Sequence, residues 1–195
     1  MADVLRMLRS GTAAEHQDVE RTLDLMDPHL QRPRLVAVLA RLHGFWVAAE
    51  AGLDAWAGRH PTDASGVDWP RRRRAALFAT DLRALDGDVA PTLPHLQAVP
   101  DTDAALGRMY VLEGSTLGGA FIDRHLAGLP HLADVRLRAF SPYGAETGAM
   151  WHGFRRATRD RITAGGDAAA VVASARCTFG ALADWCRTPA AVTGV

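Results

Sequence analysis

Three side chains near the amino terminus combine metal-binding chemistry with a spacing that places them on one helix face. His16 lies among apolar positions of an amphipathic segment, and Glu20 follows one helical turn later. A carboxylate there can reach the imidazole Nδ1, directly or through water, and hold Nε2 toward a metal. Arg9 lies two turns before His16, about 10 Å away by helical rise, and suits a carboxylate on the rim of a flat ligand. The trio indicates a ligand-binding helix, and a packed structural histidine is the alternative.

A second segment, residues 107–122, places glycines in the middle of a helical pattern. Gly114, Gly118 and Gly119 lie close together, and each mid-helix glycine costs about 0.5–1 kcal/mol relative to alanine. Gly114 and Gly118 are four apart, so they open a slot without side chains one turn after Tyr110. The slot predicts that backbone approaches something flat and that the helix bends there, with close helix–helix packing as the alternative. A Walker or dinucleotide loop does not fit, because no GK[ST] follows and no strand precedes.

Apolar residues recur at three and four positions along most of the chain, and strand-like alternation is nowhere sustained. We therefore expect an all-α, irregular helical bundle. Pro33 is suited to a first helical turn, Asp68 and Asp167 are expected helix caps, and Gly165-Gly166 ends a helix. Loops are expected over 60–68 and 87–101. The expected helices cover 3–25, 33 to about 56, 70 to about 85, about 103 to 126, about 141 to 163, and 168–187.

The composition is that of an ordinary globular chain. Its 195 residues are 48% hydrophobic and 23% charged, with a formal net charge of zero, which favours neither nucleic acid nor a membrane surface as a partner. No signal peptide and no unbroken apolar run of about 18 residues is visible. Cys177 and Cys186 lie on opposite faces of one expected helix and form no CxxC pair. We expect one domain over 1–195, with about eight loose residues at its carboxyl end, in the cytoplasm.

The two segments together resemble the biliverdin-producing haem oxygenases, particularly bacterial members associated with phytochrome chromophore synthesis. LRxxTxxxHxxxE occupies residues 8–20, and YVLEGSTLGGAFI occupies 110–122. The resemblance implies a haem-oxygenase-like bundle that opens haem to biliverdin with release of iron and carbon monoxide. Haem would be both substrate and cofactor, with O2 as co-substrate. No flavin or nicotinamide motif is visible, so electrons are expected from an external reductant, either a redox partner protein or a small molecule. A bacterial phytochrome is the downstream partner that the subgroup implies.

The resemblance also implies roles for individual residues. His16 would be the proximal iron ligand, oriented weakly or through water by Glu20, and residues 110–122 would form the kinked distal helix. Gly114, Ser115 and Gly118 would act in catalysis at the kink. The residues expected to contact haem elsewhere are Arg9, Tyr110, Thr116, Leu117, Gly119, Trp151, Phe154 and Arg156, of which Arg9 and Arg156 would pair with propionates; His152 matches a further basic position.

Ser115 departs from the animal-type pattern, in which this position is an aspartate that anchors a water network. Ser115, Thr116 and backbone carbonyls freed at the kink are expected to hold water instead. The departure keeps open a non-catalytic haem sensor or carrier of the same fold. A di-iron oxidase is a further alternative, but its sites use ExxH pairs, and no glutamate of the chain has histidine three residues later.

The remaining charged and imidazole side chains show no ligand pattern. The run Arg71–Arg74 is expected to form a solvated helix face, with docking of an acidic electron donor as the alternative. The other histidines are expected to be structural or exposed: His29, His43, His60, His95, His125 and His131.

Overall fold

The computed structural model describes residues 3–187, and within them the chain is all-helical, as predicted. Three short 3-10 turns interrupt or precede the helices. The α-helices are α1 (Val4–Gly11), α2 (Ala13–Leu23), α3 (Arg32–Arg59), α4 (Pro61–Gly66), α5 (Ala75–Ala84), α6 (Thr102–Gly114), α7 (Gly119–Gly128), α8 (Thr147–Thr163) and α9 (Ala168–Arg187), and the 3-10 turns are η1 (Trp69–Arg72), η2 (Ser115–Gly118) and η3 (Gly144–Glu146). The predicted loose tail falls outside the described residues.

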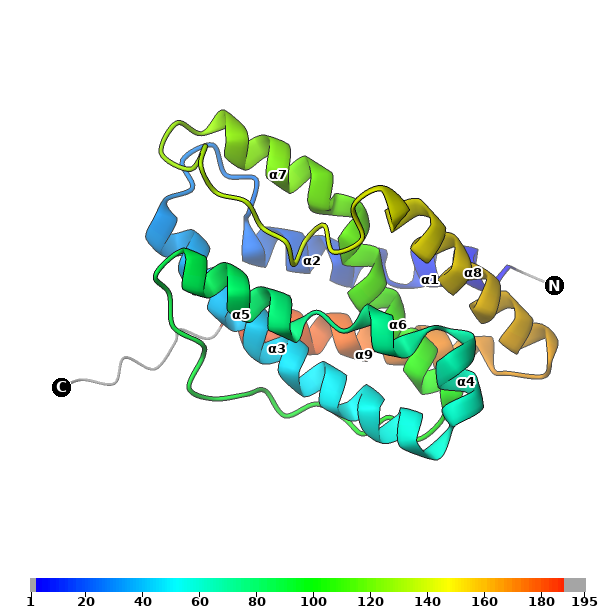
Figure 1. Ribbon diagram of the computed structural model, residues 1–195. Helices are drawn as coiled ribbons and strands as arrows, with labels where there is room; N and C mark the ends of the chain where they lie inside the picture. The colour runs from blue at the N-terminus through cyan, green and yellow to red at the C-terminus, as the bar shows by residue number, and fades with distance from the viewer. Residues whose placement is uncertain (1–2, 188–195) are drawn as a thin grey trace.

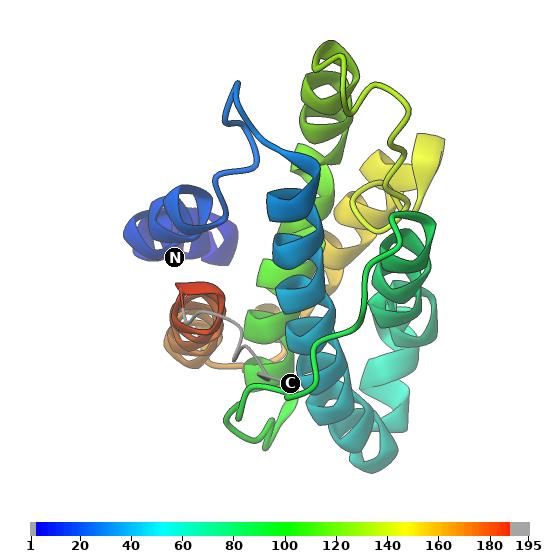
Figure 2. The same ribbon diagram turned by 90° about the vertical axis from the view of Figure 1, so that its left-hand side faces the viewer.

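Helix α6 runs through the middle of the bundle and packs against α3, α8 and α9 (Figure 1). Its closest neighbour is α9, and Gly107 makes that approach possible. A Cβ at Gly107 would overlap the Val171 carbonyl and lie 2.6 Å from the Ser174 Cβ. Helices α1 and α2 lie on α9, so that the two ends of the described chain form one layer beside α6 (Figure 2).

Helix α3 supplies the largest share of the core. Eleven of its residues are buried, including Leu35, Phe45, Leu53 and Trp56. By length and composition this helix could also cross a membrane. It contains no unbroken run of about 18 apolar residues, so its sequence alone does not predict a membrane span. Since 56% of its apolar stretch is buried inside the protein, the hydropathy is that of a core helix.

Several predicted helix boundaries are confirmed. Pro33 lies in the first turn of α3, and residues 87–101 contain no helix before α6. Gly165 has a φ of 98° just after α8, a conformation that favours glycine. Asp167 caps α9, because its Oδ1 accepts from the backbone N–H of Ala169 at 2.8 Å and of Ala170 at 3.3 Å.

The single helix predicted over 3–25 is wrong, because the chain breaks at Gly11-Thr12. Thr12 leaves helical geometry, with φ −118° and ψ 7°, and its hydroxyl donates to the Leu8 carbonyl at 2.7 Å. Gly11 lets α1 approach α9, since a Cβ there would lie 2.8 Å from a methyl group of Val172.

Four other features of the predicted helices differ in the structure. Residues 61–66 of the expected loop form α4, which Pro61 starts. The helix expected from Pro70 begins only at Ala75, because Asp68 has a φ of 53° with no capping bond and is followed by η1. The long helix expected over 103–126 is split by η2 into α6 and α7, and α8 begins at Thr147 after η3.

Candidate functional site

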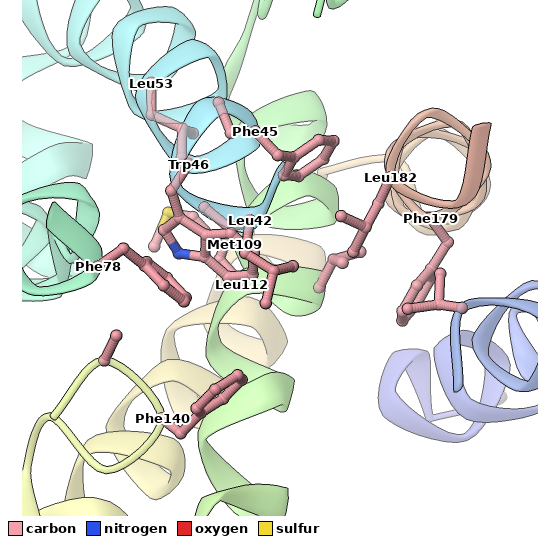
Figure 3. Close-up of a cluster of buried hydrophobic side chains, with 14 of the residues drawn as sticks. Leu42, Phe45, Trp46, Leu53, Phe78, Met109, Leu112, Phe140, Phe179 and Leu182 are labelled. Carbon is pink, nitrogen blue, oxygen red and sulfur yellow. The ribbon is translucent and has the colours of Figure 1, made fainter. Parts of the chain in front are cut away.

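A cavity of about 710 Å³ separates α2 from the α6–η2–α7 segment. Its walls come from α2, the 24–26 loop, α3, the α6–α7 segment, Phe140, Trp151 and α9. Figure 3 shows Phe140 on one side of this space, with Phe179 and Leu182 of α9 on the other. The volume is that of a pocket for a sizeable organic ligand, and its lining is mostly apolar.

His16 lies on α2 at the wall of this cavity. Its side chain is 55% exposed, and its ring packs edge-on against Phe179, with centroids 5.5 Å apart. The Nδ1 atom lies 3.6 Å from the Glu20 carboxylate, which is longer than a direct hydrogen bond. The imidazole is therefore accessible for ligation and only loosely oriented by Glu20, as the one-turn spacing predicts.

Gly114 and Gly118 face the cavity from the opposite wall. A Cβ built on either residue would meet no atom within 4 Å, so neither glycine is needed for helix packing. This excludes the packing alternative for these two positions. The glycines open backbone to the cavity, and side chains there would project into the space that a ligand needs.

Gly119 has a different role from its two neighbours. A Cβ there would overlap the Phe140 carbonyl oxygen and lie 2.8 Å from the Ser141 Oγ. Gly119 therefore brings α7 onto the backbone of the 140–141 loop and does not line the cavity. Thr116 is buried and turned away as well, since its hydroxyl donates to the Glu113 carbonyl at 2.7 Å. Leu117 does line the cavity and is 44% exposed.

Tyr110 and Trp151 lie together at one end of the cavity, and Arg9 lies outside it, near enough for its charge to act on Tyr110. Tyr110 and Trp151 both line it, with ring centroids 5.9 Å apart. Burial raises the pKa of Tyr110, while a hydrogen bond with Thr12 and the charge of Arg9 act in the opposite direction. Arg9 is itself exposed and does not line the cavity, but its charge reaches this end. The arrangement places an aromatic pair and a cation where an anionic ligand edge could lie.

The residues predicted on α8 beyond Trp151 are not brought to the cavity wall. Phe154 is completely buried behind Trp151, with which it stacks at 5.4 Å. Arg156 and His152 are exposed on α8 and are absent from the cavity lining. Phe154 thus supports Trp151 from behind, and the structure gives Arg156 no contact with the site.

The interpretation of Arg71–Arg74 as a solvated face is wrong for two of the four residues. The segment is not α-helical, and its side chains alternate: Arg71 and Arg73 form surface ion pairs, whereas Arg72 and Arg74 are buried. Arg72 pairs with the buried carboxylate of Glu113, at the end of α6. Both inward arginines therefore lie beneath the kink that follows Gly114.

Arg74 and Ser115 are joined beneath the kink. Ser115 lines the cavity, donates its hydroxyl to the Leu112 carbonyl at 2.6 Å, and accepts from Arg74 Nη2 at 2.8 Å. The same guanidinium donates to the carbonyls of Leu112 and Ala139. The free carbonyl expected at the kink is thus present: it is that of Leu112, and it accepts hydrogen bonds from the side chains of Arg74 and Ser115.

Several apolar residues of the cavity wall escape prediction from sequence. Their helical spacing is the same as that of ordinary core positions, so periodicity alone does not distinguish them. They are Val19, Leu23, Leu42, Trp46, Phe121, Ile122, Phe140, Phe179 and Leu182. Phe121 and Ile122 lie in the segment 110–122 that was predicted as the distal helix, although neither was predicted to contact haem.

A di-iron site finds no ligand set in the described part of the chain. No group of three histidine, cysteine, aspartate or glutamate side chains within residues 3–187 lies close enough to share a metal ion. His125 and His131 are engaged with the carbonyls of Asp27 and Leu30, as expected for structural histidines. Both cysteines are free thiols.

Comparison with known proteins gives a consistent picture. The chain is 28% identical over 155 residues to a heme oxygenase of Xanthomonas campestris pv. campestris, covering 77% of this chain and 87% of the relative. Its fold is similar to that of the Neisseria meningitidis heme oxygenase solved with NO and CO, with a TM-score of 0.75 at 19% identity, over 96% of this chain and 92% of the other. The heme oxygenase of Leptospira interrogans gives a TM-score of 0.71 at 14% identity, over 95% and 99% of the two chains. The family model for heme oxygenase matches residues 2–188, and the chain therefore belongs to the heme oxygenase family.

Proposed function

We propose that this chain opens haem to biliverdin in the cavity between α2 and the α6–α7 kink, with His16 as the iron ligand. The observation that carries the proposal is the juxtaposition of His16 with Gly114 and Gly118 across one apolar cavity. Family membership makes the protein an oxidoreductase that degrades haem. The individual roles of these residues are what we add.

The residues present fit haem. An accessible imidazole faces the cavity on one side, and on the other side two glycines leave open a cradle that a pair of Cβ atoms would fill. Apolar side chains from α3 and α9 surround the space, as a flat macrocycle requires. Arg9 and Tyr110, at one end, would receive the propionates.

Bound haem supplies the redox chemistry with O2 and is itself the ring that is opened, with electrons from an external reductant. His16 would hold the iron through an imidazole whose Nδ1 lacks a direct hydrogen bond to the Glu20 carboxylate. Such a ligand donates less electron density than a thiolate. The backbone at Gly114 and Gly118 would restrict what can bind on the kink side, and the apolar wall would exclude bulk water.

Single turnover tests the proposal. Purified protein loaded with one equivalent of hemin is mixed with ascorbate or another mild reductant in air, and absorption is followed together with CO release. We expect the Soret band to bleach while a broad red biliverdin band grows. A stable oxygenated complex without ring opening would instead establish the non-catalytic sensor or carrier of the same fold.

We further propose a cytoplasmic protein whose biliverdin serves a bacterial phytochrome. The support for the phytochrome is the resemblance of residues 8–20 and 110–122 to phytochrome-associated members. The two free cysteines, Cys177 and Cys186, fit a reducing compartment. Co-expression with a phytochrome apoprotein should give a red-absorbing photoreversible product. Assembly only when biliverdin is added from outside would contradict this.

A further inference from the structure

Arg74 is a buried cation whose guanidinium contacts no carboxylate within the described residues. Its side chain is only 1% exposed, and its donors go to the neutral acceptors Leu112 O, Ala139 O and Ser115 Oγ. The nearby carboxylate of Glu50 accepts instead from the backbone N–H of Arg74, at 2.6 Å. Burial lowers the pKa of Arg74, and the charges of Glu113 and Glu50 oppose that shift. Since arginine stays protonated in proteins, the site holds a positive charge that no direct ion pair neutralises.

This charge lies directly behind the cavity wall. Ser115, which accepts from Arg74 Nη2, lines the cavity, and so does Trp46. The guanidinium carbon of Arg74 lies 5.0 Å from the centroid of the Trp46 ring. Arg74 therefore reaches the cavity through two neighbouring side chains, on the side where the glycine kink lies.

Two N–H groups at this place have no acceptor among the described residues. They are Arg74 Nε and Trp46 Nε1, and both residues are almost completely buried. Figure 3 shows the indole nitrogen of Trp46 on the side of the ring that faces Phe78, and Phe78 follows Arg74 by one turn of α5. Buried donors without a partner are rare in folded proteins and are commonly satisfied by ordered water.

We propose that Arg74 and Trp46 hold an ordered water beside Ser115, and that this water and the Arg74 charge together make the kink side of the cavity favour negative charge on a bound ligand. Arg74 is then a positioning residue for the reaction. The effect on haem ligands rests on the proposed function, whereas the water site does not.

The direction of the effect follows from the donors. A water that accepts from both Arg74 Nε and Trp46 Nε1 has used both lone pairs, so its two protons must point elsewhere. Ser115 Oγ, which lines the cavity, keeps a lone pair after it accepts from Arg74 Nη2 and can accept one of these protons. The guanidinium charge acts in the same sense, since water-excluded surroundings strengthen its field. An aspartate in place of Ser115 would carry the opposite charge, so this chain reaches water ordering by a different arrangement.

The water is tested first without haem. A crystal structure of the haem-free protein at a resolution that shows ordered solvent should place a water about 2.7–3.2 Å from both Arg74 Nε and Trp46 Nε1. An empty site, or both groups bonded to protein atoms, would overturn the proposal. Because no haem is present, this result stands whether or not the chain degrades haem.

The charge is tested on the ferrous CO complex by infrared spectroscopy. A positive charge or hydrogen-bond donor beside bound CO draws electron density into its antibonding orbitals and lowers the C–O stretching frequency. We expect Arg74→Gln to raise that frequency, and to weaken fluoride binding to the ferric complex roughly tenfold. Trp46→Phe, which removes only the donor and part of the ring, should raise the frequency by a smaller amount and keeps the test available if Arg74→Gln does not fold.

Two controls separate charge from structure. Arg71→Gln removes an exposed arginine of the same run, whose partner is Glu146 at the surface, and should leave the CO frequency unchanged. Arg74→Lys keeps the charge without the planar fork, and should restore part of the shift. An unchanged frequency in both Arg74→Gln and Trp46→Phe would refute the proposal. Failure of every variant and the wild type to bind haem would count against the proposed function and leave the water site to the crystal structure.

Discussion

The two walls of the cavity are built differently. The wall that carries His16 is a short surface helix, α2, in which Val19 is the buried residue. It is held on α9 by the ring contact of His16 with Phe179 and by exposed ion pairs such as Arg176–Glu15. The opposite wall, at the kink after Gly114, is braced from below by Arg72, Glu113 and Arg74, which are all at most 4% exposed. Tyr143 adds a hydrogen bond to Glu113 at 2.8 Å.

This difference indicates that the two walls differ in rigidity. Buried polar networks with many hydrogen bonds hold one geometry and resist change, whereas a surface helix with few buried contacts adjusts at low cost. We infer that the kink wall is formed before ligand binding, and that α2 settles onto the ligand through His16. The predictions below test each wall in turn.

The largest effect is expected at the Arg72–Glu113 pair. Glu113→Gln removes the carboxylate and leaves a buried guanidinium without its charge partner, which should lower the free energy of unfolding by about 3–5 kcal/mol. Urea denaturation of the haem-free protein measures the change. The double variant Arg72→Met with Glu113→Leu should recover part of the loss. A loss below about 1 kcal/mol for the single variant would show that the kink wall is not braced by this pair.

The neighbouring glycines should respond in opposite ways to alanine. Gly119→Ala forces a Cβ onto the Phe140 carbonyl and should destabilise the haem-free protein by about 1–3 kcal/mol. Gly118→Ala has helical geometry and open space, so it should stabilise the haem-free protein by about 0.5–1 kcal/mol. The same change should weaken hemin binding, because the methyl group enters the cavity. Thermal denaturation and hemin titration of both variants check this, and equal behaviour of the two would contradict the assignment.

The ionisation of Glu50, which lies beside Arg74, should contribute to the pH dependence of stability. Burial raises the pKa of Glu50 above its usual value, despite hydrogen bonds from the N–H groups of Arg74 and Ala75 and the charge of Arg74. Because its pKa is higher in the folded than in the unfolded state, protonated Glu50 stabilises the fold. This stabilisation is complete below the unfolded-state pKa of 4.5 and is lost as pH rises through the folded-state pKa. Glu50→Gln keeps the acceptor, so its stability relative to wild type should grow from pH 4.5 toward neutrality. A constant difference across that range would contradict it.

The smallest effect is expected on the His16 wall. Arg176→Gln removes the exposed ion pair with Glu15 that links α9 to α2, and should cost between 0 and about 1 kcal/mol. The loss should shrink further in high salt, because exposed pairs are screened. Denaturant unfolding at two salt concentrations measures this. A loss as large as that of Glu113→Gln would mean that the two walls are held equally firmly.

Much of the fold could be predicted from the sequence, because the local signals agree with the final structure. Pro33, Gly165 and Asp167 each carry a conformational preference that needs no tertiary contact, and each helix boundary they predict is confirmed. The break at Thr12 was missed although Gly11, a poor helix former, stands beside it. Gly11 also lies close to Val172, which is 161 positions away in the chain, and local patterning does not reveal that contact.

Part of the site could also be predicted from the sequence, for a related reason. His16, Tyr110, Gly114 and Gly118 stand out because their chemistry or their missing side chains are unusual on a helix, and all four line the cavity. Arg74 was missed because a run of four arginines is typical of a solvated surface. The alternation of buried and exposed side chains accompanies a change of backbone conformation, from the 3-10 turn Trp69–Arg72 to the extended Arg73, with φ −70° and ψ 133°.

The central claim, that His16 holds the haem iron, is tested most directly by hemin titration of wild type, His16→Ala and the matched control His29→Ala, an exposed histidine outside the cavity lining. We predict a stoichiometric histidine-type Soret band for wild type and His29→Ala. For His16→Ala we predict that the band is lost or displaced and that added imidazole restores it. A His16→Ala spectrum identical to that of wild type would contradict the account.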